Sequence, residues 1–161
     1  MSQQYQFEQI YDAHYSSVYR LCKGYFNGDD ATASDAAQEV FIKVWQHLPN
    51  FRHDANLSTW IYRIAVNTCL LQLRKPVSKK EIRTDRLPDV AAEAYNPAQE
   101  ERLQKMYACI QQLDAANRVV VLMMLEQVAY EQIAEVVGIS ADTLRVRIHR
   151  IKKQLATCVQ L

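Results

Sequence analysis

The sequence predicts an all-α protein built from two small helical blocks, residues 1–75 and 98–161, joined by a flexible, extended linker at 76–97. Three observations support this prediction. Apolar residues recur at helical spacing through both blocks. The 161 residues include only three glycines and four prolines, which favours long helices and few tight turns. Three of those prolines lie between the blocks, where apolar periodicity is weak and charges of both signs alternate.

Composition is that of an ordinary soluble chain, with 49% hydrophobic and 23% charged residues and a formal net charge of +1. No apolar run approaches the roughly 18 residues of a membrane span, and the N-terminus MSQQYQFEQI lacks the features of a signal peptide. We therefore expect a cytoplasmic protein without membrane insertion. The motifs GxSxG, HExxH and the P-loop are missing, which argues against an enzyme.

The four cysteines and four histidines are scattered, with no CxxC or HxxxH spacing, so no metal and no other cofactor is expected. Cys22 and Cys69 lie within apolar helical patterns. They are interpreted as small buried residues, with a redox-sensing thiol as the alternative.

Three helices are expected in the first block. Helical spacing over residues 7–22 predicts the first, and the sequence NGDD then marks a turn. The second is predicted by apolar residues over 37–48. The third begins near Ser58 or Thr59, either of which can act as the N-cap. Its expected buried stripe consists of Ile61, Ile64, Ala65, Thr68 and Gln72.

Four helices are expected in the second block. Apolar spacing predicts one over residues 103–113, and 119–125 is apolar enough to be a buried helix, with a strand as the weaker alternative. A third carries its apolar face from Tyr130 to Val137. Gly138 follows, where a positive φ would end that helix, and Ser140 can cap the next one.

The last helix has one apolar and one basic face. Leu144, Ile148, Ile151 and Leu155 fall within roughly 60° of one another at about 100° per residue. The opposite face presents Asp142, Arg145, Val146, His149 and Lys153, with Arg150 and Lys152 at its margins. A helix, a glycine turn and a capped basic helix predict a helix-turn-helix whose second helix enters the major groove of DNA. The alternatives for a basic helix are a solvated face or a partner-binding one.

Three stretches carry a family resemblance: SDAAQEVFIKVWQHLPNF, STWIYRIAVNTCLLQLRK and YEQIAEVVGISADTLRVRIHR. Together they resemble the extracytoplasmic-function (ECF) sigma factors of the sigma-70 family over nearly the whole chain. The resemblance implies that residues 1–75 are region 2, which docks on core RNA polymerase and recognises and melts the minus-ten element. It implies that residues 98–161 are region 4, which recognises the minus-thirty-five element of promoter DNA. An anti-sigma factor is implied as a further partner.

The resemblance also assigns roles to residues. The implied polymerase-binding residues are Asp35, Gln38 and Glu39, with Val40, Phe41, Val44 and Trp45 in the core. The implied minus-ten contacts are Asn56, Trp60, Arg63, Asn67 and Arg74, together with the loop 50–58 that captures a flipped base. Trp60 is as well explained as a core anchor. The expected minus-thirty-five contacts are Ser140, Thr143, Arg145, Val146, Arg147, His149, Arg150 and Lys153.

The chain departs from the family pattern at three positions. Gln127 and Ala129 stand where a Gly and a Ser are frequent, so the first helix of the turn motif loses its capping hydroxyl. Val146 stands where Ser is common. The alternative functions are a stand-alone helix-turn-helix transcriptional regulator and a helical scaffold protein. The small net charge predicts weak unaided binding to DNA, which favours a protein that reaches DNA with help.

Overall fold

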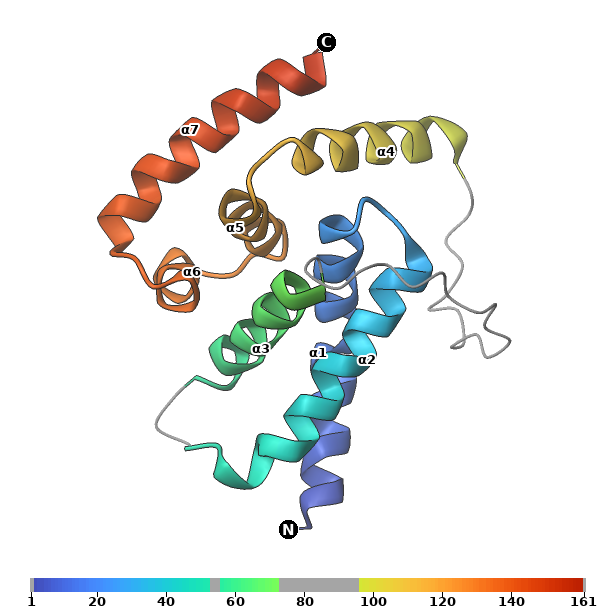
Figure 1. Ribbon diagram of the computed structural model, residues 1–161, viewed down its shortest axis with the longest axis vertical. Coiled ribbons are helices and arrows are strands. Elements are labelled where there is room, and N and C mark those ends of the chain that lie inside the picture. The colour runs from blue at the N-terminus through green and yellow to red at the C-terminus, as the bar shows by residue number, and fades with distance from the viewer. Residues whose placement is uncertain (1, 53–55, 73–95, 161) are drawn as a thin grey trace.

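The computed structural model describes residues 2–52, 56–72 and 96–160. These residues form seven α-helices and one 3₁₀ turn, without a strand (Figure 1). The elements are α1 Gln3–Tyr25, α2 Asp30–His47, η1 Leu48–Asn50, α3 Leu57–Gln72, α4 Pro97–Gln111, α5 Ala115–Leu125, α6 Tyr130–Val137 and α7 Ala141–Gln160. The all-α prediction is confirmed, and the strand alternative for 119–125 is wrong. Residues 73–95, which include most of the expected linker 76–97, lie outside the described residues.

Helices α1 to α3 form what we call the N-terminal unit. Long helices α1 and α2 lie side by side, and α3 packs on both (Figure 1). The turn between α1 and α2 places Asn27 and Gly28 at positive φ, and Asp29 then caps α2 by accepting from the backbone N–H of Ala31. Val40, Phe41 and Val44 are buried as expected. Trp45 is not a core residue, since 41% of it is exposed.

The start of α3 corrects one prediction. The helix begins at Leu57, and the Asn56 side chain accepts from the backbone N–H of Thr59 at 3.3 Å. Asn56 is therefore the N-cap, in place of Ser58 or Thr59. The physical reason is that asparagine is among the strongest N-caps, which lets the helix start before Ser58.

Helices α4 to α7 form the C-terminal unit. Asn96 caps α4, where Pro97 occupies the first helical position, and Asp114 caps α5. Buried residues run through α5 from Val119 to Met123, which makes this helix the centre of the unit. Helices α4, α6 and α7 pack around it.

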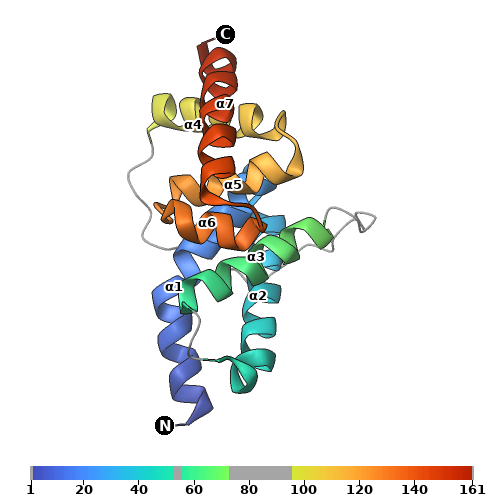
Figure 2. The same cartoon turned by 90° about the vertical axis from the view of Figure 1, so that its left-hand side faces the viewer.

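The two units pack against each other as one body. Helix α1 contacts α4 and α5, and α6 lies across α3 (Figures 1 and 2). A single hydrophobic cluster runs through both units. Gly24 allows a close approach of α1 to α5, because a Cβ built on it would lie 2.3 Å from Cδ2 of Leu122. Tyr62 and Val66 of α3 are buried, although the expected stripe omitted them.

Polar contacts fix the same interface. The Arg20 guanidinium donates to both carboxylate oxygens of Glu126 at 2.8 to 3.1 Å, and the Glu126 side chain is only 11% exposed. Gln111 donates from its side-chain amide to the carbonyl of Tyr25 at 2.7 Å. The guanidinium carbon of Arg118 lies 5.0 Å from the centre of the Tyr25 ring. The hydrogen-bonded charge pair supplies orientation as well as attraction.

Candidate DNA-binding and polymerase-docking surfaces

The helix-turn-helix is formed by α6 and α7. Gly138 takes the left-handed conformation at φ 77°, and its N–H donates to the carbonyl of Ala134 at 2.8 Å. The Ser140 hydroxyl then accepts from the backbone N–H of Thr143 at 3.1 Å. Both predicted signals of the turn are therefore confirmed. Ala129 gives α6 no side-chain cap, which is consistent with its departure from the family pattern.

Helix α7 exposes the side that the sequence predicted. Leu144, Ile148 and Ile151 are buried against the rest of the C-terminal unit. Val146 on the opposite side is 55% exposed. The other exposed residues of the predicted reading surface are Ser140, Thr143, Arg145, His149, Arg150 and Lys153, and Arg147 is half-buried. A basic helix is thus presented to solvent along one continuous face.

Arg145 is held by two carboxylates. Its Nη1 donates to Oδ1 of Asp142 at 3.1 Å, and its Nη2 lies 3.6 Å from Oε1 of Glu131 on α6. All three side chains are more than half exposed, so these ion pairs contribute little to stability. They do orient the guanidinium at the N-terminal end of the exposed face, where base edges are read in helix-turn-helix proteins.

The sequence predicts a minus-ten ridge of Arg63, Asn67, Leu70 and Arg74, spaced by four, three and four residues. Helix α3, which carries it, lies beside α6. Arg63 and Asn67 are exposed, and Nη2 of Arg63 donates to the backbone carbonyl of Glu135 on α6 at 3.4 Å. Leu70 on the same ridge is half-buried. Figure 2 shows α6 lying over α3. Arg74, the last residue of the ridge, lies outside the described residues. One edge of the ridge is therefore occupied by the helix-turn-helix.

A surface cavity of about 400 Å³ adjoins the predicted base-capturing loop. Its lining includes Phe51 and Leu57 from the two ends of that loop, and Gln6, Gln9 and His14 from α1. The α1 residues were missed because nothing in their spacing indicates that this helix faces the loop. Burial lowers the pKa of His14, which favours its neutral form.

Two of the predicted minus-ten contacts, Asn56 and Trp60, have structural partners. Asn56 caps α3 through its side chain. The Trp60 ring lies 4.7 Å from the Phe51 ring and is half-buried. The Trp60 ring thus holds the segment that follows η1 against α3, and part of the ring surface stays accessible to solvent.

The predicted docking face of α2 is more apolar than the sequence analysis proposed. Both carboxylate oxygens of Asp35 are shielded from solvent. Glu39 accepts from the side-chain amide of Gln72 at 2.8 Å and lies 3.8 Å from the ammonium of Lys43. Gln38 is exposed. Of the three predicted polar contacts, Gln38 is therefore the most accessible.

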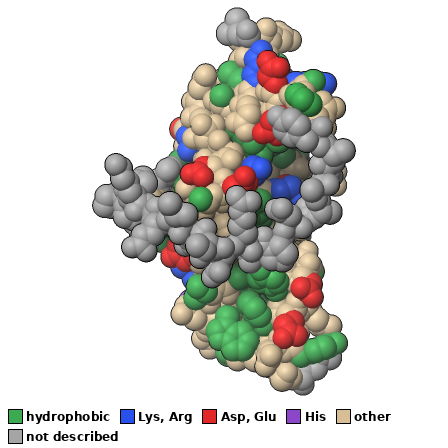
Figure 3. Space-filling view, turned by 90° about the vertical axis from the view of Figure 1, so that its right-hand side faces the viewer, with side chains coloured by type: hydrophobic (Ala, Val, Ile, Leu, Met, Phe, Trp, Pro, Cys, Tyr) green, Lys and Arg blue, Asp and Glu red, His purple; other side chains and the backbone are tan. Residues whose placement is uncertain are grey.

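Two apolar side chains share the exposed side of α2 with Gln38. Ile42 is 57% exposed, and Trp45 lies three residues further on. Spacings of four and three residues place all three on one face, opposite Val40 and Val44. Figure 3 shows hydrophobic side chains gathered over the end of the molecule where α1 begins and α2 ends. One signal in the sequence could have indicated this exposed apolar face. Ile42 is apolar, but it does not follow the spacing of the buried residues Val40 and Val44.

The described residues offer neither a candidate membrane span nor a candidate metal site. Their helices include none that combines the length and apolarity of a membrane span. Their His, Cys, Asp and Glu side chains form no group of three or more that could hold a metal ion.

Comparison with known families gives two matches in the order that the sequence predicted. Residues 10–77 match the model of sigma-70 region 2, and residues 103–155 match the model of sigma-70 region 4.

Curated relatives are RNA polymerase sigma factors. The chain is 32% identical to the ECF RNA polymerase sigma factor SigE of Mycolicibacterium smegmatis, over 92% of this chain and 59% of that protein. It is 32% identical to the RNA polymerase sigma-H factor of Pseudomonas aeruginosa, over 84% of this chain and 77% of that protein. It is 34% identical to the ECF RNA polymerase sigma-E factor of Escherichia coli K12, over 78% of this chain and 73% of that protein. The chain thus spans less than two thirds of the SigE relative and about three quarters of the other two.

Solved structures share the fold. CnrH in complex with the cytosolic domain of CnrY aligns with a TM-score of 0.76 at 19% identity, covering 98% of this chain and 89% of that chain. The sigma factor RpoE of Bartonella quintana in complex with the anti-sigma factor NepR aligns with a TM-score of 0.74 at 18% identity, covering 97% and 98%. Both alignments extend over the two helical units together.

Proposed function

The chain belongs to the extracytoplasmic-function sigma factors of the sigma-70 family, the subunits that bind core RNA polymerase and direct promoter-specific initiation, and we propose how its surfaces divide this work. The N-terminal unit docks on polymerase and engages the minus-ten element, and the C-terminal unit engages the minus-thirty-five element. The chain acts by binding rather than by catalysis, and its place of action is the cytoplasm.

Polymerase docking is assigned to the exposed face of α2, made of Gln38, Ile42 and Trp45. Apolar side chains this exposed are unfavourable in a free protein and become favourable when a partner covers them. Asp35 and Glu39, which the sequence analysis assigned to docking, support the shape of this face from its flank. Glu39 does so through its contacts with Gln72 and Lys43.

Minus-ten recognition is assigned to α3 and the cavity beside it. Arg63 and Asn67 face the DNA backbone and the base edges, and Trp60 with Phe51 forms the aromatic wall beside the loop. The cavity of about 400 Å³ is large enough for a small ligand of the size of a nucleobase. Flipping a base costs a few kcal/mol of stacking and pairing, which contacts in such a pocket replace.

Minus-thirty-five recognition is assigned to the exposed face of α7. Arg145, Val146 and His149 read base edges in the major groove, and Arg147, Arg150 and Lys153 hold the phosphates. At the start of the helix, the backbone N–H of Ser140 and the hydroxyl of Thr143 donate to the phosphate that flanks the motif, because the Thr143 N–H already donates to the Ser140 hydroxyl and that hydroxyl donates to the Thr143 oxygen.

The packed arrangement of the two units has to open before both elements are bound. Helix α6 occupies one edge of the α3 ridge, and the Arg63 side chain is hydrogen-bonded to it. Core polymerase would separate the units and hold them at the spacing of the promoter, which raises their effective concentration at the two elements. We also propose that an anti-sigma factor binds the packed form, because the solved neighbour RpoE is in complex with the anti-sigma factor NepR.

The exposed basic face of α7 behind a capped glycine turn is the observation that carries the proposal. The test is in vitro transcription with core polymerase on genomic fragments of the host. We expect start sites that depend on adding the chain, and promoter affinity that is at least tenfold weaker without core. Equal, nanomolar, sequence-specific binding with and without core would instead identify a stand-alone regulator.

A further inference from the structure

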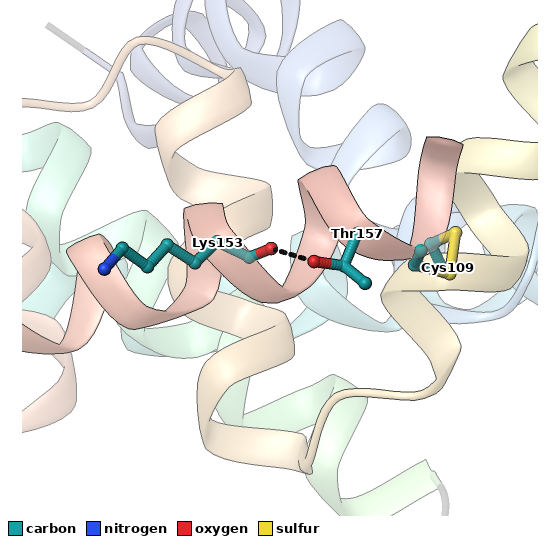
Figure 4. The surroundings of a disulfide bond; sticks show 4 residues. Cys109, Lys153 and Thr157 are labelled. Atoms are coloured by element: carbon teal, nitrogen blue, oxygen red, sulfur yellow. Dashed lines mark hydrogen bonds between the residues drawn. A yellow bond between two sulfur atoms is a disulfide. The ribbon is translucent and has the colours of Figure 1, made fainter. Parts of the chain in front are cut away.

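The four cysteines meet as two pairs in the folded chain. Cys109 and Cys158 are joined by a disulfide with Cα atoms 5.8 Å apart (Figure 4). Cys22 and Cys69 remain thiols, with sulfur atoms 3.7 Å apart. Neither pair has a spacing that indicates a motif, and the disulfide joins residues 49 positions apart. The fold alone brings the partners together.

The disulfide lies where α7 has few other attachments. Ile151 is the last buried residue of this helix, and the nine residues 152–160 follow it. Among these nine, only Leu155 and Cys158 are half-buried, and the others are exposed. Cys109, in the last turn of α4, is buried. The bond therefore fastens the end of α7, with the hydrogen bond from Thr157 to the Lys153 carbonyl one turn before it (Figure 4).

The two cysteine pairs differ in access. An open hollow of about 500 Å³ lies beside the disulfide and is lined by Gln112, Gln154, Thr157 and Cys158 itself. Cys22 and Cys69 are fully buried in the N-terminal unit. The Cys69–Cys22 hydrogen bond and burial raise the pKa of the Cys69 thiol. Because the thiolate is the reactive form, the buried pair is protected, whereas Cys158 of the other pair is open to reagents from the hollow.

We propose that Cys109 and Cys158 form a reversible thiol–disulfide site, oxidised by a low-molecular-weight disulfide, whose state sets how firmly the end of α7 is held on α4. In the oxidation, the Cys158 thiolate attacks one sulfur of glutathione disulfide, and one glutathione thiolate leaves. The Cys109 thiolate then attacks the Cys158 sulfur of the mixed disulfide, and the second glutathione thiolate leaves. Two electrons pass to glutathione, and its thiolates take up the two protons that the cysteines lose.

The consequence for transcription rests on the proposed function. In the bacterial cytoplasm thiols are kept reduced, and the disulfides that do form there are as a rule transient or redox-sensing. Lys153 lies in the fastened part of α7 and is assigned to a phosphate. Holding this part in place before binding lowers the ordering cost of that contact. The oxidised chain is therefore expected to bind the minus-thirty-five duplex more tightly, by about three- to tenfold.

The first test maps the cysteines of the full chain after equilibration in glutathione buffers of increasing oxidation. Samples are quenched with acid, alkylated in denaturant and mapped by mass spectrometry. We expect a crosslink between Cys109 and Cys158, while Cys22 and Cys69 are alkylated as thiols in the same molecules. A stable glutathione adduct on Cys158 without a crosslink would overturn the proposal, as would earlier crosslinking of the buried pair.

The second test measures amide hydrogen exchange of the oxidised and the reduced chain. Residues 152–160 should exchange at least tenfold faster after reduction, and residues 141–151 should not change. Cys158→Ser should show the fast exchange in both buffers. Equal protection of 152–160 in both states would refute the role in holding α7. Neither test uses DNA or polymerase, so each can fail independently of the proposed function. The regulatory consequence fails if both states bind a minus-thirty-five duplex with equal affinity.

Discussion

Replacing Gly24 by alanine tests whether the two units pack in solution as they do in Figure 1. Gly24 is a buried residue in the last turn of α1. A Cβ at this position would lie 2.3 Å from Cδ2 of Leu122 and 3.5 Å from its Cγ, both on α5 of the other unit. Leu122 is itself buried, so its side chain has little room to move away.

Two opposing effects set the size of the change. Alanine is favoured over glycine inside a helix by about 1 kcal/mol or less, and the gain is smaller near a helix end. Overpacking of a filled interior costs about 1–3 kcal/mol. If the units are packed, Gly24→Ala should lower the free energy of unfolding by about 0.5–2 kcal/mol. If the units are apart, only the helix propensity remains, and the substitution should stabilise α1. The sign of the change in unfolding free energy therefore decides whether the units are packed in solution.

The assay is urea unfolding of the full chain, followed by circular dichroism. The matched controls are Leu122→Ala and the double variant, because shortening Leu122 removes the atoms that the new Cβ meets. We expect the double variant to be more stable than the sum of the single changes predicts, which is the signature of residues in contact. A stabilising Gly24→Ala whose effect adds to that of Leu122→Ala would refute the packed arrangement.

Three further outcomes are expected. Ile42→Glu should abolish most core polymerase binding in a pull-down. It should shift the melting temperature little, since the Ile42 side chain is exposed. The control Leu103→Glu makes the same kind of change at another exposed apolar residue and should bind core normally. Arg145→Ala should cost about 1–3 kcal/mol of minus-thirty-five affinity and relax preference at one base pair, which a panel of single-base variants would reveal; a uniform loss would make it a phosphate contact. Lys153→Ala should weaken all sequences alike and lower the slope of the salt dependence by about one, and an unchanged slope would remove it from the phosphate contacts.

Local signals in the sequence were sufficient for the helices and for the turn motif. Gly138 and Ser140 act through their own backbone neighbours, so their roles could be read from spacing. The apolar run of α5 likewise predicted a buried helix. The exact start of α3 was missed because Ser58 and Thr59 both looked like the N-cap. The residue that caps the helix is Asn56, which precedes them.

What escaped the sequence depends on contacts between distant segments. Tyr62 is buried because the C-terminal unit covers its side of α3, and no periodicity within α3 records that cover. Trp45 looked like core because aromatic residues usually are, yet its ring packs edge-on against Phe7, with 5.3 Å between the ring centres, and stays 41% exposed. The pairing of Cys109 with Cys158 could not be predicted, because it depends on how the chain folds from α4 to α7. The roles assigned to the DNA-contacting residues remain predictions.

The Gly24–Leu122 contact also bears on how much promoter DNA the chain can bind. In the proposed function, packed and separated forms are in equilibrium, and only the separated form is competent to hold both promoter elements. The apparent affinity is then the intrinsic affinity multiplied by the competent fraction. Each 1.4 kcal/mol that favours packing reduces that fraction about tenfold. A substitution at this glycine therefore sets the threshold of core polymerase concentration at which promoters respond, although the residue itself touches neither DNA nor polymerase.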